Sequence, residues 1–371
     1  MKTVAHCISP YLQTAGPWVY EQIRRAERYR PAVLTQGACN LEHYPIESLH
    51  SAENFPPFKK ICNRIWRKTT NNYAFYPGML RREDAALMHA HFGYEAARLL
   101  TCKQATALPL LTTFYGADAT EYPRYTAWRE RYRRLFAVGE LFLAEGGAMA
   151  QKLVDLGCPQ DKVRIWRLGV DVERIEFAVR SAGERTRLLI CAGFKEKKGI
   201  PYALRALSAV LAQKSFPYAL TLIGDGEDRR LIEALVDELG LRPYSTFTGM
   251  MPYEQVLAEL SRHDILLQTS VTAQNGDGEG GAPVILLDAQ ASGMPVVATT
   301  HGDIAEYVRD GETGLLAAER DIEGLAEKIM TLVEQPERWA VMGRAGRRHV
   351  EQNYEAQRQV GILEQIYDEL V

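Results

Sequence analysis

A glycine-rich segment with acidic neighbours is the part of the sequence best suited to bind a phosphorylated ligand. It precedes an apolar run typical of a helix, and its residues are Glu279, Gly280, Gly281, Ala282 and Pro283. Glycine lets backbone N–H groups approach an anion closely, and proline suits the first helical turn, so we expect the helix to begin near residue 283. Asp288 then lies about one and a half turns along, placed for the hydroxyls of a ribose. A flexible loop with a solvated Asp288 is the alternative.

A second candidate is the basic loop in CAGFKEKKGIPYALRAL, residues 191–207. Lys195, Lys197 and Lys198 follow an apolar run at 188–191 that predicts a strand, and ligands bind beyond the carboxyl ends of strands in open α/β sheets. A lysine there could neutralise a diphosphate as its bond to a sugar breaks, without a metal. The alternative for the three lysines is a solvated run of charge.

The first half of the chain offers aromatic and histidine side chains after apolar runs. Tyr115 and Asp118 lie in TTFYGADATEYPR, and His89 and His91 share one face of a strand in MHAHFG. A tyrosine of ordinary acidity is no base near neutral pH, so we expect Tyr115 to bind or orient. No third metal ligand lies within sequence reach of the histidines, which favours strand-end packing, with His91 able to contact an acceptor.

The elements that must position these residues alternate between apolar runs and amphipathic, helix-length segments. The runs near residues 32, 87, 109 and 140, and again near 187, 219, 264 and 294, predict parallel strands with crossover helices. We therefore expect an α/β protein of two doubly wound domains, residues 1–175 and 176–350. Residues 336–371 are predicted to be helical, and 351–371 to pack back on the first domain.

Length and composition agree with two folded domains and exclude several classes of protein. The chain has 371 residues, 44 Lys+Arg against 47 Asp+Glu, and 46% hydrophobic residues. It lacks an apolar run long enough to cross a bilayer, and its first residues do not resemble a signal peptide, so we expect a cytoplasmic protein. Six scattered cysteines favour neither a zinc site nor a disulfide framework.

Residues 279–300, in which the glycine loop is followed by ASGMPVVAT, resemble the nucleotide-sugar signature of the retaining glycosyltransferases of family 4. That resemblance implies the GT-B architecture of two facing Rossmann-like domains, with a C-terminal helix crossing back to the first. The family has two glutamates in this signature. Here Asp288 stands in place of the second, and because the loop is one residue longer, the first corresponds to Glu279. By resemblance Glu279 positions the donor sugar and Asp288 binds the ribose.

Other segments extend the resemblance, with departures. Lys198 occupies the lysine of the family's GRxxxxKG element, whereas Gly193 stands where the family has arginine. Gly249 falls where family members frame the nucleobase. Tyr115 replaces a histidine of the family's FHGxD loop, which leaves Asp118 as a match on the acceptor side. Gly16 matches one of the amino-terminal glycines that approach donor and acceptor.

The function that the resemblance implies is retaining transfer of a sugar, from a nucleotide sugar such as a UDP-sugar, to a hydroxyl of a glycan, lipid-linked or small-molecule acceptor. The resemblance is closest to enzymes of bacterial exopolysaccharide and colanic-acid type. It implies that no cofactor or metal is needed, and it assigns the catalytic roles to Glu279, Lys198 and Tyr115. A nucleotide-sugar epimerase or phosphorylase is an alternative. A non-catalytic sugar-nucleotide-binding scaffold is another, encouraged by Gly193 and Tyr115.

Two stretches of the first domain, residues 58–68 and 124–134, are basic and aromatic. They suit a peripheral contact with the inner face of a membrane, a lipid diphosphate or an acidic glycan. Equally, their arginines could cover apolar surface on solvated helices. Nucleic acid is not favoured, because the isoelectric point is about 6.3 and no binding module is recognised.

Overall fold

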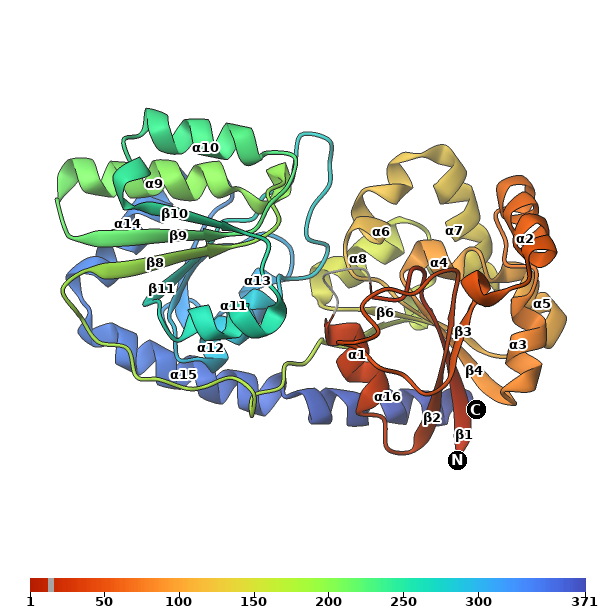
Figure 1. Cartoon of the computed structure of the whole chain (residues 1–371). Coiled ribbons are helices and arrows are strands. Elements are labelled where there is room, and N and C mark those ends of the chain that lie inside the picture. Colours follow the sequence, from red (N-terminus) through yellow and green to blue (C-terminus); the bar gives the residue numbers. More distant parts are fainter. Residues whose placement is uncertain (13–16) are drawn as a thin grey trace. The chain divides into compact units, whose positions relative to one another are not determined.

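The computed structural model describes residues 1–12 and 17–371, so Gly16 lies outside the described residues. The chain divides into two compact units, Met1–Gly169 with Ala356–Val371, and Val170–Glu355 (Figure 1). The first boundary therefore falls before residue 175, because Val170, Val172 and Ile175 pack into the core of the second unit. The carboxyl-terminal segment likewise begins at Ala356 rather than at residue 351.

The first unit is built on a parallel sheet of seven strands. The strand order is β3-β2-β1-β4-β5-β6-β7, which reverses direction between β1 and β4. In doubly wound sheets that reversal is the point at which ligands bind. The strands are β1 (Lys2–Cys7), β2 (Tyr29–Thr35), β3 (Leu49–Ser51), β4 (Ala85–His91), β5 (Leu110–Thr113), β6 (Leu141–Ala144) and β7 (Val163–Ile165).

Helices cover both faces of this sheet, as the nearly continuous burial of its strands requires. They are α1 (Pro17–Arg24), α2 (Pro57–Thr70), α3 (Tyr76–Arg82), α4 (Gly93–Ala96), α5 (Leu100–Thr106), α6 (Ala117–Thr120), α7 (Thr126–Val138), α8 (Gly147–Asp155) and α16 (Ala356–Leu370). The carboxyl-terminal helix α16 packs on this unit as expected. Its Glu364 accepts the backbone N–H groups of Glu27 and Arg28 at 2.8 and 2.6 Å, and Trp166 donates to the Gln359 carbonyl at 2.9 Å.

The second unit repeats the plan with a parallel sheet of six strands. Their order, β10-β9-β8-β11-β12-β13, places the reversal between β8 and β11. Both sheets are thus doubly wound, as the alternation of the sequence predicts. The strands are β8 (Thr186–Cys191), β9 (Tyr218–Ile223), β10 (Ser245–Gly249), β11 (Ile265–Gln268), β12 (Val296–Thr299) and β13 (Gly314–Ala317).

In this unit α9 (Ile200–Gln213), α10 (Arg229–Glu238) and α14 (Ile322–Glu334) lie on one face of the sheet (Figure 1). On the other lie α11 (Tyr253–Leu260), α12 (Ile285–Ala291) and α15 (Glu337–Asn353), and α13 (Ile304–Tyr307) follows β12. The prediction of helix over residues 336–371 is confirmed, apart from a break at residues 354–355. The chain leaves helical geometry at Tyr354, whose carbonyl accepts the Val170 N–H at 2.8 Å and whose ring packs at a tilt against that of Tyr307.

Across the described residues, no helix combines the length and the hydrophobicity that a bilayer-spanning segment needs.

Candidate functional site

An ion pair lies at the reversal point of the second sheet. Lys198 ends the short helical turn Glu196–Lys198 that follows β8, and Glu279 lies in the loop that follows β11. The Lys198 ammonium is 2.9 and 2.7 Å from the two carboxylate oxygens of Glu279. The Ser270 hydroxyl also donates to Glu279, at 2.6 Å. The structure therefore brings together two of the three residues to which the resemblance assigns catalytic roles.

Neighbouring cations decide the protonation state of Glu279. Burial alone would raise the pKa of Glu279, which is 8% exposed, but the cations of Lys198 and Lys197 outweigh burial and hold the pKa below its usual value. Lys197 has its own partner, Asp277, at 3.1 Å. An ammonium carries three N–H donors, so Lys198 keeps donor capacity for an anionic oxygen beside Glu279.

The glycine loop is held by residues that follow β12. The Glu279 N–H donates to His301 Nε2 at 3.0 Å, and His301 Nδ1 is 2.6 Å from a Glu319 oxygen. Gly302 has a φ of 54°, and a Cβ there would lie 2.7 Å from the Gly281 carbonyl oxygen. Gly280 and Gly281 are thus packed against neighbouring backbone rather than flexible.

The helix after this loop begins two residues later than the sequence predicts. Ala282 packs into the core, and the carbonyl of Pro283 accepts the Leu286 N–H at 3.0 Å, which makes a turn before α12 begins at Ile285. Asp288 consequently belongs to the first turn of α12. Its side chain is buried rather than solvated, with only 2% exposed.

Asp288 has a strongly perturbed acidity. Burial raises the pKa of Asp288 to about 7, although a hydrogen bond at 2.9 Å from the Tyr253 hydroxyl opposes the rise. The Cys191 thiol at the end of β8 feels both Asp288 and Lys198: burial and the carboxyl raise its pKa to about 12, and the lysine lowers it. Asp288, Lys198 and Glu279 therefore gather around the same end of the sheet.

Two glycines of the predicted donor site have space around them. Gly193 follows β8, and a Cβ there would lie 4.0 Å from the nearest atom, the Asp225 carbonyl oxygen. A longer side chain would fit at this position, so steric crowding does not explain why glycine stands where the family has arginine. Gly249 ends β10 with a φ of 75°, a conformation that glycine adopts without strain.

At the reversal point of the first sheet, a chain of hydrogen bonds leads to Tyr115. The Tyr115 hydroxyl is 2.7 Å from His91 Nδ1, and His91 Nε2 is 3.0 Å from His6 Nδ1. Burial raises the pKa of Tyr115 well above its ordinary value, so its hydroxyl stays protonated. His91 is fully buried, and both of its ring nitrogens are engaged, one with Tyr115 and one with His6.

A third histidine, distant in sequence, lies beside His89 and His91. His6 of β1 lies opposite His89 in the sheet, and the nitrogens of the three rings lie within 4.8 Å of one another. His89 also bonds Tyr367 and Thr113, each at 2.8 Å. Burial lowers the pKa of all three histidines, that of His6 to about 3, so neutral rings pair with one another and with hydroxyls.

The Asp118 side chain is directed at backbone N–H groups around its own loop. It is fully buried, and its carboxylate accepts backbone N–H groups from Gly93 at 2.8 Å, Tyr115 at 3.1 Å and Gly116 at 2.9 Å. Burial raises the pKa of Asp118, and these hydrogen bonds oppose the rise. Asp118 therefore fixes the loop that carries Tyr115.

Several residues of the site escaped sequence reasoning: His6, Tyr253, Ser270, His301 and Glu319. Ser270 and His301 follow β11 and β12, the carboxyl ends at which parallel sheets gather ligands, so their position was the available signal. His6 likewise lies at the end of β1. Tyr253 gave no signal, because it reaches Asp288 from a helix distant in sequence.

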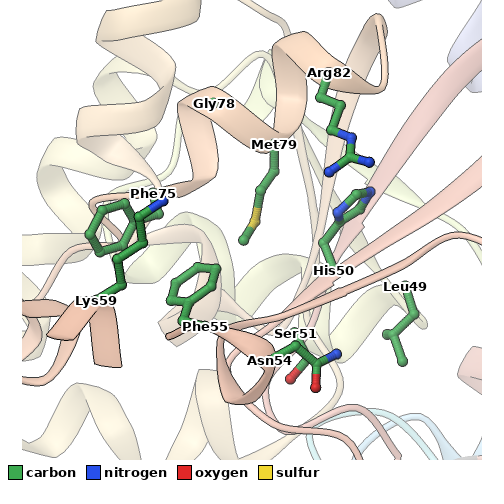
Figure 2. A pocket seen from close by; sticks show the side chains of 10 residues that line it. All are labelled: Leu49, His50, Ser51, Asn54, Phe55, Lys59, Phe75, Gly78, Met79 and Arg82. Atoms are coloured by element: carbon green, nitrogen blue, oxygen red, sulfur yellow. The ribbon is translucent and has the colours of Figure 1, made fainter. Parts of the chain in front are cut away.

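A hollow of about 370 Å³ in the first unit lies apart from these residues. Figure 2 shows Phe55, Phe75 and Met79 around it, with Lys59 and Arg82 on different sides. It is bordered by the edge strand β3, and none of the predicted site residues lines it. It therefore adds nothing to the predicted site.

Comparison with known proteins identifies the family. Residues 171–349 match the model of the glycosyl transferases group 1, and residues 20–174 match that of glycosyltransferase family 4. The chain is 32% identical to the amylovoran biosynthesis glycosyltransferase AmsK of Erwinia amylovora, over 67% of this chain and 61% of that protein. It is 31% identical to the putative colanic acid biosynthesis glycosyltransferase WcaL of Salmonella typhimurium, over 65% and 59%. The chain spans about three fifths of the length of these relatives.

Solved structures establish the fold as GT-B. HepE of Anabaena, in complex with UDP and glucose, superposes with a TM-score of 0.81 at 16% identity, over the full length of both chains. The lipopolysaccharide outer core galactosyltransferase WaaB gives 0.73 at 14% identity, again over both full lengths. At such identities the likeness is one of fold.

Proposed function

Because the chain belongs to the glycosyltransferases of group 1, we propose that it is a retaining hexosyltransferase that uses a nucleotide sugar and no metal. The acceptor is a hydroxyl of a glycan, lipid-linked or small-molecule substrate, in line with the amylovoran and colanic acid relatives. A UDP-sugar is the proposed donor, supported by the UDP and glucose bound to HepE. The observation that carries the proposal is the buried pair of Lys198 and Glu279.

The second unit offers a group for each part of such a donor. Asp288 lies in the first turn of α12, where its carboxylate can accept the ribose hydroxyls. Lys198 supplies a positive charge for the diphosphate, which accumulates negative charge as the sugar leaves. Glycine at positions 280 and 281 places no side chain between the backbone and a phosphate oxygen, and Gly249 leaves space for the base.

The environment of Glu279 argues against its acting as a nucleophile. Its oxygens accept from Lys198 and Ser270, so attack on the sugar would require breaking both interactions. Retention is then better served by front-face substitution, in which the acceptor hydroxyl attacks on the side from which the diphosphate departs. The leaving phosphate takes the acceptor proton, while Glu279 positions the donor sugar.

In this proposal the first unit supplies the side chain that orients the acceptor substrate. The Tyr115 hydroxyl keeps its proton because burial raises its pKa, so it orients an acceptor and does not remove a proton from it. His91 positions that hydroxyl through the bond to its Nδ1. Asp118 contributes by holding the Tyr115 backbone.

Substitution of the ion pair tests the proposal. Lys198→Ala should lower turnover of a UDP-sugar by about a hundredfold or more, the usual cost of losing one electrostatic group in a site. Glu279→Ala should also lose turnover, whereas Lys195→Ala, an exposed lysine of the same loop, should keep it. Thermal unfolding of each variant checks the fold. Unchanged turnover in both site variants would overturn the assignment.

The product and the metal requirement complete the test. The anomeric configuration of the product, read by NMR, should match that of the donor, and a chelator should leave the rate unchanged. An inverted product would refute the retaining mechanism. Epimerised sugar formed from donor alone would reassign the chain to the epimerases.

A further inference from the structure

Helix α2 is inverted relative to an ordinary amphipathic helix, whose apolar side faces the core. Asn63 is its only buried residue, and the Asn63 amide donates to the Gln36 side-chain oxygen at 2.7 Å. The apolar side chains face outward, and they are Phe58, Ile61, Ile65 and Trp66, at 75%, 58%, 57% and 44% exposed. No other helix within the described ranges carries more than one exposed large apolar side chain. The first unit itself thus leaves the apolar side of α2 (Figure 1) uncovered.

The exposed apolar side chains form one stripe bordered by positive charge. At about 100° per residue, the four side chains together with Cys62 span an arc of about 140°, and Lys59 and Lys68 border it. The helix carries five cations and no acid, namely Lys59, Lys60, Arg64, Arg67 and Lys68. Of the ion pairs found in the described part of the chain, none includes these five residues. This combination suits a surface that is both apolar and anionic.

A cavity of about 440 Å³ adjoins the basic side of the stripe. It is lined by Arg64, Arg67, Lys68, Asn71 and Arg98. Arg98 pairs with Glu95 at 2.7 Å, whereas Arg64, Arg67 and Lys68 of α2 form no ion pair within the described residues. The Asn71 side-chain nitrogen is buried and has no hydrogen-bond partner in the described structure. Three cations and an unmet N–H donor are the complement of a phosphate group.

The second basic and aromatic stretch, residues 124–134, differs from α2 in that most of its cations have partners. In α7 the guanidinium groups of Arg133 and Arg134 pair with Glu130 at 2.7 and 3.3 Å. The guanidinium of Arg131 covers the Trp128 ring at 4.8 Å. Arg129 also donates to the Pro123 carbonyl, at 2.7 Å. Four of the five arginines of residues 124–134 thus have a partner within the unit, and Arg131 covers apolar surface as the alternative predicts. The structure separates two stretches that the sequence treats alike.

We propose that α2 docks on a bilayer that contains anionic phospholipids, with its apolar stripe between headgroups and acyl chains and a lipid phosphate in the cavity beside Arg64. A soluble polyanion would need only the cations and leaves the apolar stripe unexplained. The inference deepens the acceptor part of the proposed function, because a lipid-linked acceptor is presented at such a surface. Docking itself requires neither donor nor turnover.

Vesicle flotation of the full chain without donor tests the docking. The protein should float with vesicles of phosphatidylcholine and phosphatidylglycerol, far less with phosphatidylcholine alone, and binding should weaken as salt rises. Ile61→Gln should lower the partition coefficient about tenfold or more, because burial of a large aliphatic side chain is lost. The double variant Arg133→Gln, Arg134→Gln in α7 removes two charges and should bind like the original chain.

A charge-matched pair on α2 tests the cavity. Lys60→Gln removes a cation outside it and should cost about fivefold in partition, the effect of one charge near an anionic surface. Arg64→Gln removes a cation that lines the cavity, and it should cost about tenfold or more, because a charge-assisted hydrogen bond is also lost. Equal losses for the two variants would overturn the phosphate site.

Other outcomes overturn the docking itself. Binding that is equal with and without phosphatidylglycerol, or lost equally on substitution in α2 and in α7, would refute it. So would a dimer in sedimentation velocity that Ile61→Gln dissolves, because a second copy would then cover the stripe. Thermal shifts by UDP are measured in parallel, so that failure of donor binding and failure of docking are told apart.

Discussion

Asp288→Asn is expected to stabilise the free protein while weakening donor binding. The folded-state pKa of Asp288 is about 7, against an ordinary value of 3.8. The uncharged Asp288 carboxyl therefore makes its full contribution to folding stability below about pH 4. This contribution is lost as the pH rises through about 7. Asparagine keeps an oxygen to accept from Tyr253 but has no proton to lose.

The magnitude follows from the shift. About three pKa units at about 1.4 kcal/mol each give a cost of about 4 kcal/mol at alkaline pH, as an upper figure. Between about pH 5 and about pH 8 the original chain should lose about 3 kcal/mol of folding free energy relative to Asp288→Asn. Urea unfolding at several pH values measures this difference.

Donor affinity should depend on pH in the opposite direction to folding stability. Ribose hydroxyls donate to a carboxylate better than to a carboxylic acid, so affinity for UDP-glucose should rise roughly tenfold between about pH 6 and about pH 8. UDP-glucose is the suitable probe because UDP itself carries a terminal phosphate that titrates near pH 6. In Asp288→Asn, affinity should be lower and independent of pH, as calorimetric titration would record.

The matched control is Asp237→Asn. Asp237 is an exposed carboxylate of α10 whose pKa is lowered by its hydrogen bond with Arg242, so it titrates at acid pH only. That variant should keep the pH dependence of the original chain over the same interval. Parallel stability curves for the original chain and Asp288→Asn would refute the reasoning, because they would show that the buried carboxyl does not titrate near neutrality.

The remaining predictions concern packing and the acceptor side. Gly199→Ala should destabilise the second unit by about 3 kcal/mol or more in urea unfolding, since φ is 62° and a Cβ would lie 1.8 Å from the Thr269 carbonyl oxygen. Arg180→Met should cost about 3–5 kcal/mol by the same measurement, because a buried guanidinium that donates to four backbone carbonyls is lost; an unchanged midpoint would contradict this. Tyr115→Phe should lower kcat/KM for the acceptor about tenfold and leave UDP affinity unchanged, because the bond to His91 serves only the acceptor side. A parallel fall in UDP affinity would count against that role.

Sequence alone was informative at several of the strand ends where ligands are expected to gather. Apolar runs determine buried parallel strands, and glycines or cations after them mark the edge at which ligands gather, which is how Lys198 and Glu279 were found. Helix boundaries were less predictable. The start of α12 differs from the prediction by one local turn at Pro283, whereas the break between α15 and α16 depends on contacts of Tyr354 with residues distant in sequence.

Tertiary structure decided which side chains share an environment. His6 meets His91, and Tyr253 meets Asp288, only because the sheet order and the helix packing bring distant segments together. The sequence determined the types of the groups, the alternation of the fold and the family resemblance. Burial, which moves the pKa of Asp288 to about 7, is a property of the packed interior, and so is the outward stripe of α2, because exposure depends on every segment that surrounds a residue.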